Sequence, residues 1–284
     1  MQISVIISLK LLSDWKTGLN EVQLIIMKVI KAIVIAFATY SRIPMPRINM
    51  TDKDMKYVPS MFPLVGVIIA ALELGWFYIC ARFELGAVSK SAMAVAVPFI
   101  VTGGFHLDGF MDLSDALNSF KSPEERLEIL KDPHIGAFAV IRTIILVLIF
   151  VSAVAQITDP REIILFASCF VYSRLFSSFG LLVLKSAKNK GSLYYTSSNA
   201  DKNANLIILL LEFIVITAAL LWYAGIYSLV IPALSIIYFL IYKNKMYKAL
   251  GGITGDTAGY FVTVVECLCS VGVAILQLVL HFCF

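Results

Sequence analysis

The feature that most constrains this chain is a series of long apolar stretches separated by short polar segments. A helix that crosses the hydrocarbon core of a bilayer needs roughly 20 apolar residues. Hydrophobic residues make up 60% of the 284 residues and charged residues only 15%, which is outside the range of ordinary soluble domains. We therefore expect an all-α fold, namely a polytopic integral membrane helical bundle in contact with the lipid bilayer.

Polar breaks divide the chain into about seven or eight candidate membrane segments. The first, residues 23–41, contains Lys28 and Lys31, so it is alternatively a helix in the membrane interface or a re-entrant segment. Residues 27–284 are expected to form a single membrane-embedded domain, and residues 1–26 an N-terminal extension of uncertain status. The other segments lie near residues 58–80, 88–106, 135–156, 162–184, 205–224, 226–242 and 257–281.

Lysine and arginine are distributed unevenly between alternate loops. The intervening loops hold only Arg82, Lys90 and Arg161. The positive-inside rule therefore assigns the cation-rich loops to the cytosol. The net charge of +4 follows from this distribution, and no basic stripe with interleaved aromatic residues indicates a nucleic-acid partner. The cation-rich loops are 42–57, 108–133, 185–204 and 243–256.

A short amphipathic helix is predicted on the cytosolic side, between the third and fourth segments. Ser122 is a favoured N-cap residue, Pro123 suits the first helical position, and Glu125 completes a capping box. This helix is expected to stop near Asp132.

Three aspartates follow a glycine pair at the end of the third segment. On a helix, the spacing of Asp108, Asp112 and Asp115 places them within about 60° of one another. Carboxylates so arranged repel one another unless a cation lies among them or one is protonated. Oxygen ligands without thiolates favour Mg²⁺, Mn²⁺ or Ca²⁺, and Mg²⁺ commonly joins one or two carboxylates to substrate phosphates. The cluster thus predicts a phosphate-handling metal site; the alternative is a solvated acidic helix start.

A second glycine-rich motif, residues 251–256, places Asp256 four residues after a glycine pair, again at a cytosolic boundary. Glycine-rich turns allow backbone N–H groups to approach an anion closely. Asp256 is therefore a candidate substrate or metal residue, although glycine pairs are also ordinary turn residues.

Three further side chains are candidates because of their positions. His106 precedes the cluster and is either a general base for an attacking hydroxyl or a hydrogen-bonded structural residue. Arg42 and Arg174 can pair with phosphate or with the aspartates, and Arg174 needs a partner because it lies within an apolar segment. For most other charged residues within apolar segments we expect structural pairing between helices; these are Glu73, Arg142, Glu212 and Glu266.

The stretch from Gly103 to Gly109, followed by Asp112 and Asp115, closely resembles the signature of the cobalamin synthase family, the membrane-bound adenosylcobinamide-GDP ribazoletransferases. Several motifs in order are specific where one alone is weak. Residues 1–26 have no counterpart in the family, and the region from Lys188 matches only loosely. The other matching motifs are Arg-x-Pro-x-Pro at 42–46, Phe-Pro-x-x-Gly at 62–66, Lys-Asp-x-x-Ile-Gly-x-Phe at 131–138 and Gly-Gly-x-Thr-Gly-Asp-Thr at 251–257.

This resemblance implies an enzyme of the cytoplasmic (inner) membrane of a prokaryote, with its active site facing the cytosol. It implies that adenosylcobinamide-GDP is joined to α-ribazole or its 5′-phosphate, with release of GMP. Mg²⁺ (or Mn²⁺) is expected on the three clustered aspartates, and His106 or an aspartate is expected to orient or deprotonate the nucleophile. A homo-oligomer or association with other cobalamin-assembly enzymes is also expected. The implied substrate-binding residues are Arg42, Arg174, Lys185, Lys188, Asp256 and Thr257.

Two other kinds of membrane protein are alternatives to a ribazoletransferase. CDP-alcohol phosphotransferases also hold metal with helical aspartates after an Asp-Gly, but their Ala-Arg continuation and distal aspartate pattern do not occur here. A transporter would use the charged residues of the apolar segments as a path, with its site near the bilayer midplane. The strongest motifs instead lie at segment ends, which favours the ribazoletransferase interpretation.

Overall fold

The computed structural model describes residue 23 and residues 26–283, with side chains up to residue 279. Within these residues the chain contains no strand, and its only β-type pairing is an isolated bridge between Ser186 and Ile253. The expected all-α membrane fold is therefore confirmed. The predicted extension, residues 1–26, lies almost entirely outside the described residues, so the proposed domain boundary stays a prediction.

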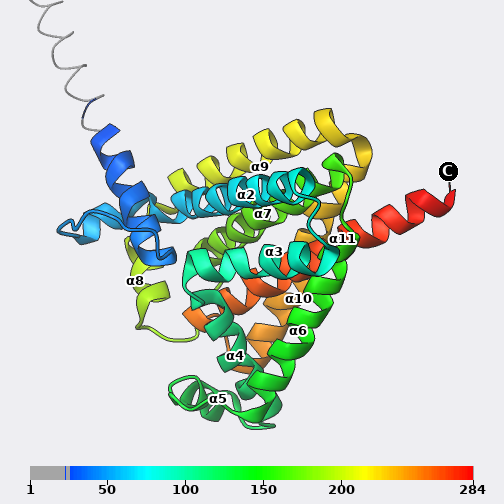
Figure 1. The fold of residues 1–284 in the computed structure, drawn as a ribbon. Coiled ribbons are helices and arrows are strands. Elements are labelled where there is room, and N and C mark those ends of the chain that lie inside the picture. Colours follow the sequence, from blue (N-terminus) through cyan, green and yellow to red (C-terminus); the bar gives the residue numbers. More distant parts are fainter. Residues whose placement is uncertain (1–22, 24–25, 284) are drawn as a thin grey trace, which may run out of the picture.

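The helices follow one another through short connections, as Figure 1 shows. A first helix ends at Tyr40. The elements after it are η1 (Asp52–Tyr57), α2 (Val58–Arg82), α3 (Ala87–Thr102), α4 (Phe105–Asn118), α5 (Pro123–Ile129), α6 (Ala137–Gln156), α7 (Pro160–Val183), α8 (Ser192–Asn199), α9 (Lys202–Ala224), η2 (Gly225–Leu229), α10 (Val230–Leu250) and α11 (Gly255–Cys283).

Local sequence signals determine several helix ends. The predicted short helix is α5: the Ser122 side chain accepts a hydrogen bond from the Glu125 N–H, and the Glu125 carboxylate accepts one from the Ser122 N–H. It ends at Ile129, slightly before the expected stop. Asp159 caps α7 in the same way. Gly251 ends α10 in the left-handed conformation, which favours glycine.

Five described stretches are long and apolar enough to cross a membrane, or six if α3 and α4 count together as one bent span. The stretch Lys202–Leu250 has 49 residues, more than twice what one crossing needs, and contains both α9 and α10. α3 has 16 residues and qualifies only together with α4, which is bent from it by 96°. A multi-pass membrane protein is thus supported, but the expected count of seven or eight segments is not confirmed.

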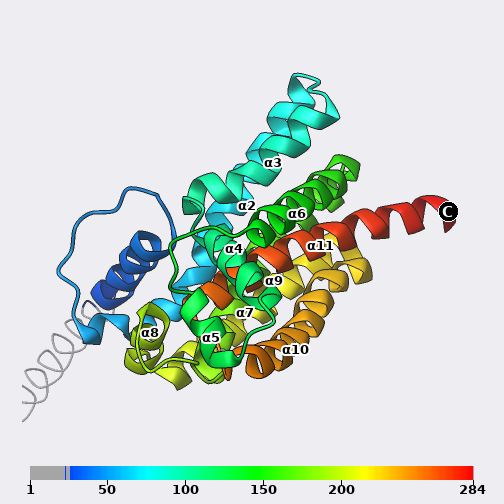
Figure 2. The ribbon, with the colours of Figure 1, turned by 90° about the horizontal axis from the view of Figure 1, so that it is seen from below.

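The cation-rich loops all meet at one end of the bundle. The Arg42 N–H donates to the Val101 carbonyl at 2.8 Å, and the Ile253 N–H donates to the Lys185 carbonyl at 2.9 Å. α5 contacts α10, and α8 contacts η1. We call this the motif end; Figure 2 shows α4 and α5 there, in front of α11 and α10. The turns after α2 and α6 lie together at the opposite end.

Part of the first helix packs on η1 and on the beginning of α2. Its buried residues Ala32, Ile35 and Ala36 form a small cluster with Met55 and Val58. Figure 1 shows this helix running across the direction of α2 and α7. This placement at the motif end fits the interfacial alternative for residues 23–41 better than a crossing.

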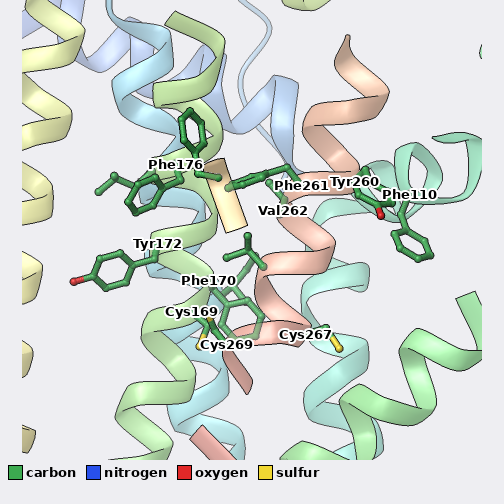
Figure 3. Packing of buried hydrophobic residues seen from close by; sticks show 14 of the residues in the cluster. Phe110, Cys169, Phe170, Tyr172, Phe176, Tyr260, Phe261, Val262, Cys267 and Cys269 are labelled. Carbon is green, nitrogen blue, oxygen red and sulfur yellow. The ribbon is translucent and has the colours of Figure 1, made fainter. Parts of the chain in front are cut away.

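α7 is the central helix of the bundle and is buried along most of its length. It contacts α2, α9, α10 and α11. A side chain at Gly66 of α2 would overlap the Phe170 carbonyl of α7, so this crossing requires glycine. Figure 3 shows Phe170 and Phe176 of α7 beside Phe261 of α11 in the main buried cluster. These contacts hold α2, α7 and α11 together, and the loops of the motif end extend from these helices.

Candidate active site

The glycine pair between α3 and α4 redirects the chain. Gly103 has φ 66° and Gly104 has φ 80°, both in the left-handed region that favours glycine. The Arg42 side chain lies directly on Gly103, where any Cβ would overlap it. Two of the sequence motifs therefore meet here. The motif at 42–46 supplies Arg42, and the glycine at position 103 leaves space for its side chain.

A cleft opens at this turn, between the end of the first helix and the start of α4. Its only charged lining residues among those described are Arg42 and Asp108, and both are exposed. The remaining lining residues are Ala38, Thr39, Ser41, Thr102, Gly103, Gly104, Phe105, Leu107 and Met111. We call it the charged cleft. One basic and one acidic side chain at its wall suit a phosphate ester and its counter-ion.

α4 lies against the first turns of α11. A Cβ at Gly109 would stand 2.6 Å from the Asp256 carbonyl oxygen, and one at Gly259 would stand 3.0 Å from the His106 carbonyl oxygen. Phe110 stacks on Tyr260 with ring centroids 5.3 Å apart, a pair labelled in Figure 3. The tertiary structure thus brings the second glycine-rich motif, with its aspartate, onto the first.

Four carboxylates influence one another at this crossing. α4 turns away from α3 and lies outside the five spans. Burial, and then the negative charges of Asp108, Asp256 and Asp115, raises the pKa of half-buried Asp112 to about 6. A cation among these groups would remove that repulsion. Asp256 therefore joins the cluster predicted from α4 alone.

Asp115 has a different partner from the other aspartates. Its carboxylate accepts hydrogen bonds from the Gly136 N–H at 2.7 Å and the Ala139 N–H at 2.9 Å. These are free donors at the N-terminus of α6, where a negative charge is favourable. A Cβ at Gly136 would stand 2.6 Å from the Asp115 carboxylate, which explains the glycine of the 131–138 motif. The structure thus gives Asp115 a structural role that the spacing did not indicate.

No group of three His, Cys, Asp or Glu side chains in the described part of the chain is arranged to hold a metal ion. The donor set still fits Mg²⁺, because this ion usually takes one or two carboxylates and completes its shell with water and substrate phosphates. Asp108 and Asp112 of α4 and Asp256 of α11 are the carboxylates available for it. Burial and the neighbouring carboxylates both raise the pKa of Asp112, and a bound cation would offset the repulsion between these charges.

The predicted lysines lie beside the second motif. The Lys185 carbonyl accepts from the Ile253 N–H, and the Ala187 N–H donates to the Ile253 carbonyl at 2.8 Å. The Lys185 side chain is exposed. Lys188 is half-buried and close enough to Asp256 for their charges to attract. Of the two alternatives, Lys188 is the one near the carboxylates.

Thr257 faces inward and stabilises the loop. Its hydroxyl accepts from the Tyr242 hydroxyl and the Thr254 N–H, each at 2.9 Å, and the side chain is fully buried. The Thr254 hydroxyl donates to the Asp256 carboxylate at 3.2 Å. Thr257 therefore orders the turn that carries Asp256, and it is not among the residues that line the charged cleft.

Arg174 also has its partner within the bundle. It forms an ion pair with Glu266 of α11, and both side chains are buried. It also donates to Ser173 at 2.9 Å. Structural pairing was expected for Glu266, whereas Arg174 was expected to contact phosphate. Its location deep in α7 places it behind His106 rather than on the charged cleft.

The other charged residues of the apolar segments give a mixed result. Arg142 of α6 donates to Asn118 of α4 at 3.0 Å, so it joins two helices as expected. Glu73 is fully buried, and neither of its carboxylate oxygens has a partner among the described residues.

His106 faces away from the charged cleft. It is 5% exposed, and its Nδ1 is buried without a hydrogen-bond partner among the described residues. Its ring lies 5.5 Å from that of Phe62 and 5.6 Å from that of Phe105. The imidazole lines a separate cavity, described below.

Sequence reasoning missed the residues that share this cavity with His106. Ser177 and Ser178 lie within an apolar segment, and Thr196 lies in α8, so nothing in the spacing distinguished them. Tyr40 also lines the cavity, and its position two residues before Arg42 was the one available signal.

Comparison with known proteins shows the family of the chain. The family model for cobalamin-5-phosphate synthase matches residues 32–274. The adenosylcobinamide-GDP ribazoletransferase of Lachnoclostridium phytofermentans is 34% identical over 88% of this chain and 96% of its own length. The proteins of the same name from Clostridium perfringens and Brevibacillus brevis are 32% and 29% identical, over 83% and 79% of this chain and 94% and 89% of their own lengths. No solved structure matches. These matches cover every motif described above, and the chain belongs to the cobalamin-5-phosphate synthase family, enzymes of cobalamin synthesis.

Proposed function

We propose that this enzyme joins adenosylcobinamide-GDP to α-ribazole or α-ribazole 5′-phosphate. The ribazole 3′-hydroxyl oxygen forms a bond to the phosphorus attached to cobinamide, and the bond from that phosphorus to GMP breaks. GMP leaves, and the hydroxyl proton is released to a base. The products are adenosylcobalamin, or its 5′-phosphate, and GMP. The names of the relatives support the first substrate, which they contain.

The observation that carries the proposal is the convergence of Arg42, Asp108, Asp112 and Asp256 at the motif end. Arg42 is placed to hold a phosphate oxygen of the pyrophosphate in the charged cleft. Lys188, beside Asp256, is the second candidate for a phosphate contact. Positioning and charge neutralisation are the main requirements of phosphoryl transfer, and these residues supply both.

A divalent ion, Mg²⁺ or Mn²⁺, is proposed on one or two of the carboxylates of Asp108, Asp112 and Asp256, with water and substrate phosphates as its other ligands. When bound, it would supply positive charge to the phosphate oxygens. One of the aspartates is proposed to orient or deprotonate the attacking hydroxyl, because the His106 imidazole faces a separate cavity and does not line the charged cleft. Arg174, Thr257 and Asp115 are assigned to support of the site, because each already has partners within the protein.

The cytoplasmic membrane of a bacterium, with the motif end facing the cytosol, is the proposed location. The cation-rich loops at that end support the orientation. A homo-oligomer or association with other enzymes of the pathway stays a prediction.

The test supplies the purified full chain in lipid nanodiscs with adenosylcobinamide-GDP, α-ribazole and Mg²⁺, and measures GMP and corrinoid product. Asp112→Asn is expected to abolish GMP release without loss of the folded protein. Glu124→Gln is the matched control, since this exposed acid lies at the same end but outside the cluster. Normal turnover by Asp112→Asn, or none by the unaltered chain, would overturn the proposal.

A further inference from the structure

A second cavity lies behind His106, and its walls differ from those of the charged cleft. It is bounded by the first helix, α2, α4, α7, α8 and α11. None of its described lining residues is Lys, Arg, Asp or Glu. We call it the aromatic cavity, because Tyr40, Phe62, Phe105 and His106 line it. An uncharged wall disfavours a phosphate group, so a ligand here must present an uncharged part.

The aromatic rings form a continuous group. The centroids of Tyr40 and Phe62 are 4.3 Å apart, and those of Phe62 and His106 are 5.5 Å apart. Rings in this arrangement offer both faces and edges to a further aromatic ring. Gly255, Ala258 and Gly259 of α11 also line the cavity, so α11 contributes only small residues to its wall.

One polar atom at the cavity wall lacks a partner among the described residues. The His106 Nδ1 is buried and makes no hydrogen bond to a described residue. Ser177 lines the cavity one turn from Leu181, whereas the neighbouring Ser178 donates to the Pro59 carbonyl at 2.7 Å. A buried ring nitrogen without a partner is costly, which points to a ligand atom that completes its hydrogen bond.

The aromatic cavity adjoins the charged cleft. Thr39 and Phe105 line both. His106 and Asp108 are two residues apart on α4, so they face roughly opposite sides of the helix, about 200° apart. A molecule with an uncharged aromatic end in the cavity can therefore present a hydroxyl past Thr39 and Phe105 to a phosphate in the cleft.

We propose that the aromatic cavity binds the base of the acceptor nucleoside, the uncharged aromatic part of α-ribazole. Its ring lies against Phe62 and Tyr40, and a ring nitrogen takes the hydrogen bond that the His106 Nδ1 lacks. This inference rests on the proposed function and adds a subsite to it. The guanine of the other substrate is the competing occupant, and the two KM values measured below distinguish it from the base of α-ribazole.

The test replaces Ser177 by leucine, which fills the aromatic cavity without touching the charged cleft. The larger side chain would occupy space that the base needs. We therefore expect Ser177→Leu to raise the KM for α-ribazole about tenfold or more, which corresponds to about 1.4 kcal/mol of binding free energy. The KM for adenosylcobinamide-GDP should be unchanged. Ser152→Leu is the matched control, because the same substitution then falls on an exposed position of α6 far from the site. It should leave both values unchanged.

A second variant guards against misfolding of Ser177→Leu. Leu181→Ala enlarges the same cavity and should raise kcat/KM for nucleosides with bulkier bases relative to α-ribazole. Binding of α-ribazole alone, measured by calorimetry on the full chain, should weaken in Ser177→Leu.

The outcomes are separable. No GMP release by the unaltered chain overturns the proposed function, and the subsite with it. If the unaltered chain is active, a rise in the KM for adenosylcobinamide-GDP instead of α-ribazole places guanine in the cavity and overturns the subsite alone. Unchanged KM values in Ser177→Leu together with unchanged base preference in Leu181→Ala also overturn it.

Discussion

Gly109 of α4 lies against Asp256 of α11 so closely that a Cβ would stand 2.6 Å from the aspartate's carbonyl oxygen. This contact joins two motifs that are almost 150 residues apart in the chain, and it places Asp256 next to Asp108 and Asp112. The site depends on this crossing, because α4 alone carries only part of the carboxylate cluster.

Gly109→Ala should therefore damage both stability and activity. Overpacking a tight crossing costs about 1–3 kcal/mol, and the shift needed to relieve it moves the aspartates apart. Melting temperature in nanodiscs and GMP release measure the two effects. Gly75→Ala is the matched control, since no atom lies within 4 Å of its added methyl group. Full activity of Gly109→Ala would show that the crossing is not needed.

Asp115→Ala should mainly reduce stability. It removes the carboxylate that accepts from the Gly136 and Ala139 N–H groups, and loss of a helix cap costs about 0.5–2 kcal/mol. Thermal unfolding should show this loss while the folded fraction keeps most of its turnover. If the variant stays stable but loses all activity, Asp115 is a metal or substrate residue after all.

Mg²⁺ should stabilise the folded protein even without substrate. A ligand present at about 100 times its Kd adds about 2.7 kcal/mol to the free energy of unfolding. The rise in melting temperature with Mg²⁺ should disappear in Asp112→Asn and persist in Glu124→Gln. An equal rise in both variants would indicate that the ion binds elsewhere.

Arg174 and Glu266 should be replaceable as a pair. Removal of one partner of a buried ion pair costs about 3–5 kcal/mol, whereas apolar replacement of both is often tolerated. Arg174→Met and Glu266→Leu are each expected to destabilise the protein, and the double variant to regain stability and GMP release. A double variant that is stable but inactive would return Arg174 to the list of substrate residues.

Thiol labelling can decide the orientation. Lys121→Cys lies at the motif end and Arg161→Cys at the opposite end, and both positions are exposed. In intact bacterial cells, an impermeant maleimide should label only Arg161→Cys. The described cysteines of the native chain are buried, so their background should be low. Labelling of Lys121→Cys in intact cells would contradict a cytosolic site.

The amino-acid sequence by itself determined the membrane class, the alternation of cation-rich loops and the helix start at Ser122. These features depend on composition and on contacts within a few residues, which apolar length, charge and capping chemistry report directly. The ordered motifs likewise identified the family, because they are read from the chain without reference to its packing. The spacing of Asp108, Asp112 and Asp115 correctly indicated an acidic face of one helix.

Only the tertiary structure decided which carboxylates lie close together and which polar groups already have a hydrogen-bond or ion-pair partner within the protein. Periodicity places residues on one face of a helix, but it does not say what packs against that face. Asp115 accepts a hydrogen bond from the N-terminus of α6, and Arg174 pairs with Glu266. Asp256 lies near the aspartates of α4. Each of these contacts joins segments that are distant in the chain. The aromatic cavity is of the same kind, since its walls come from six helices and exist only where they meet.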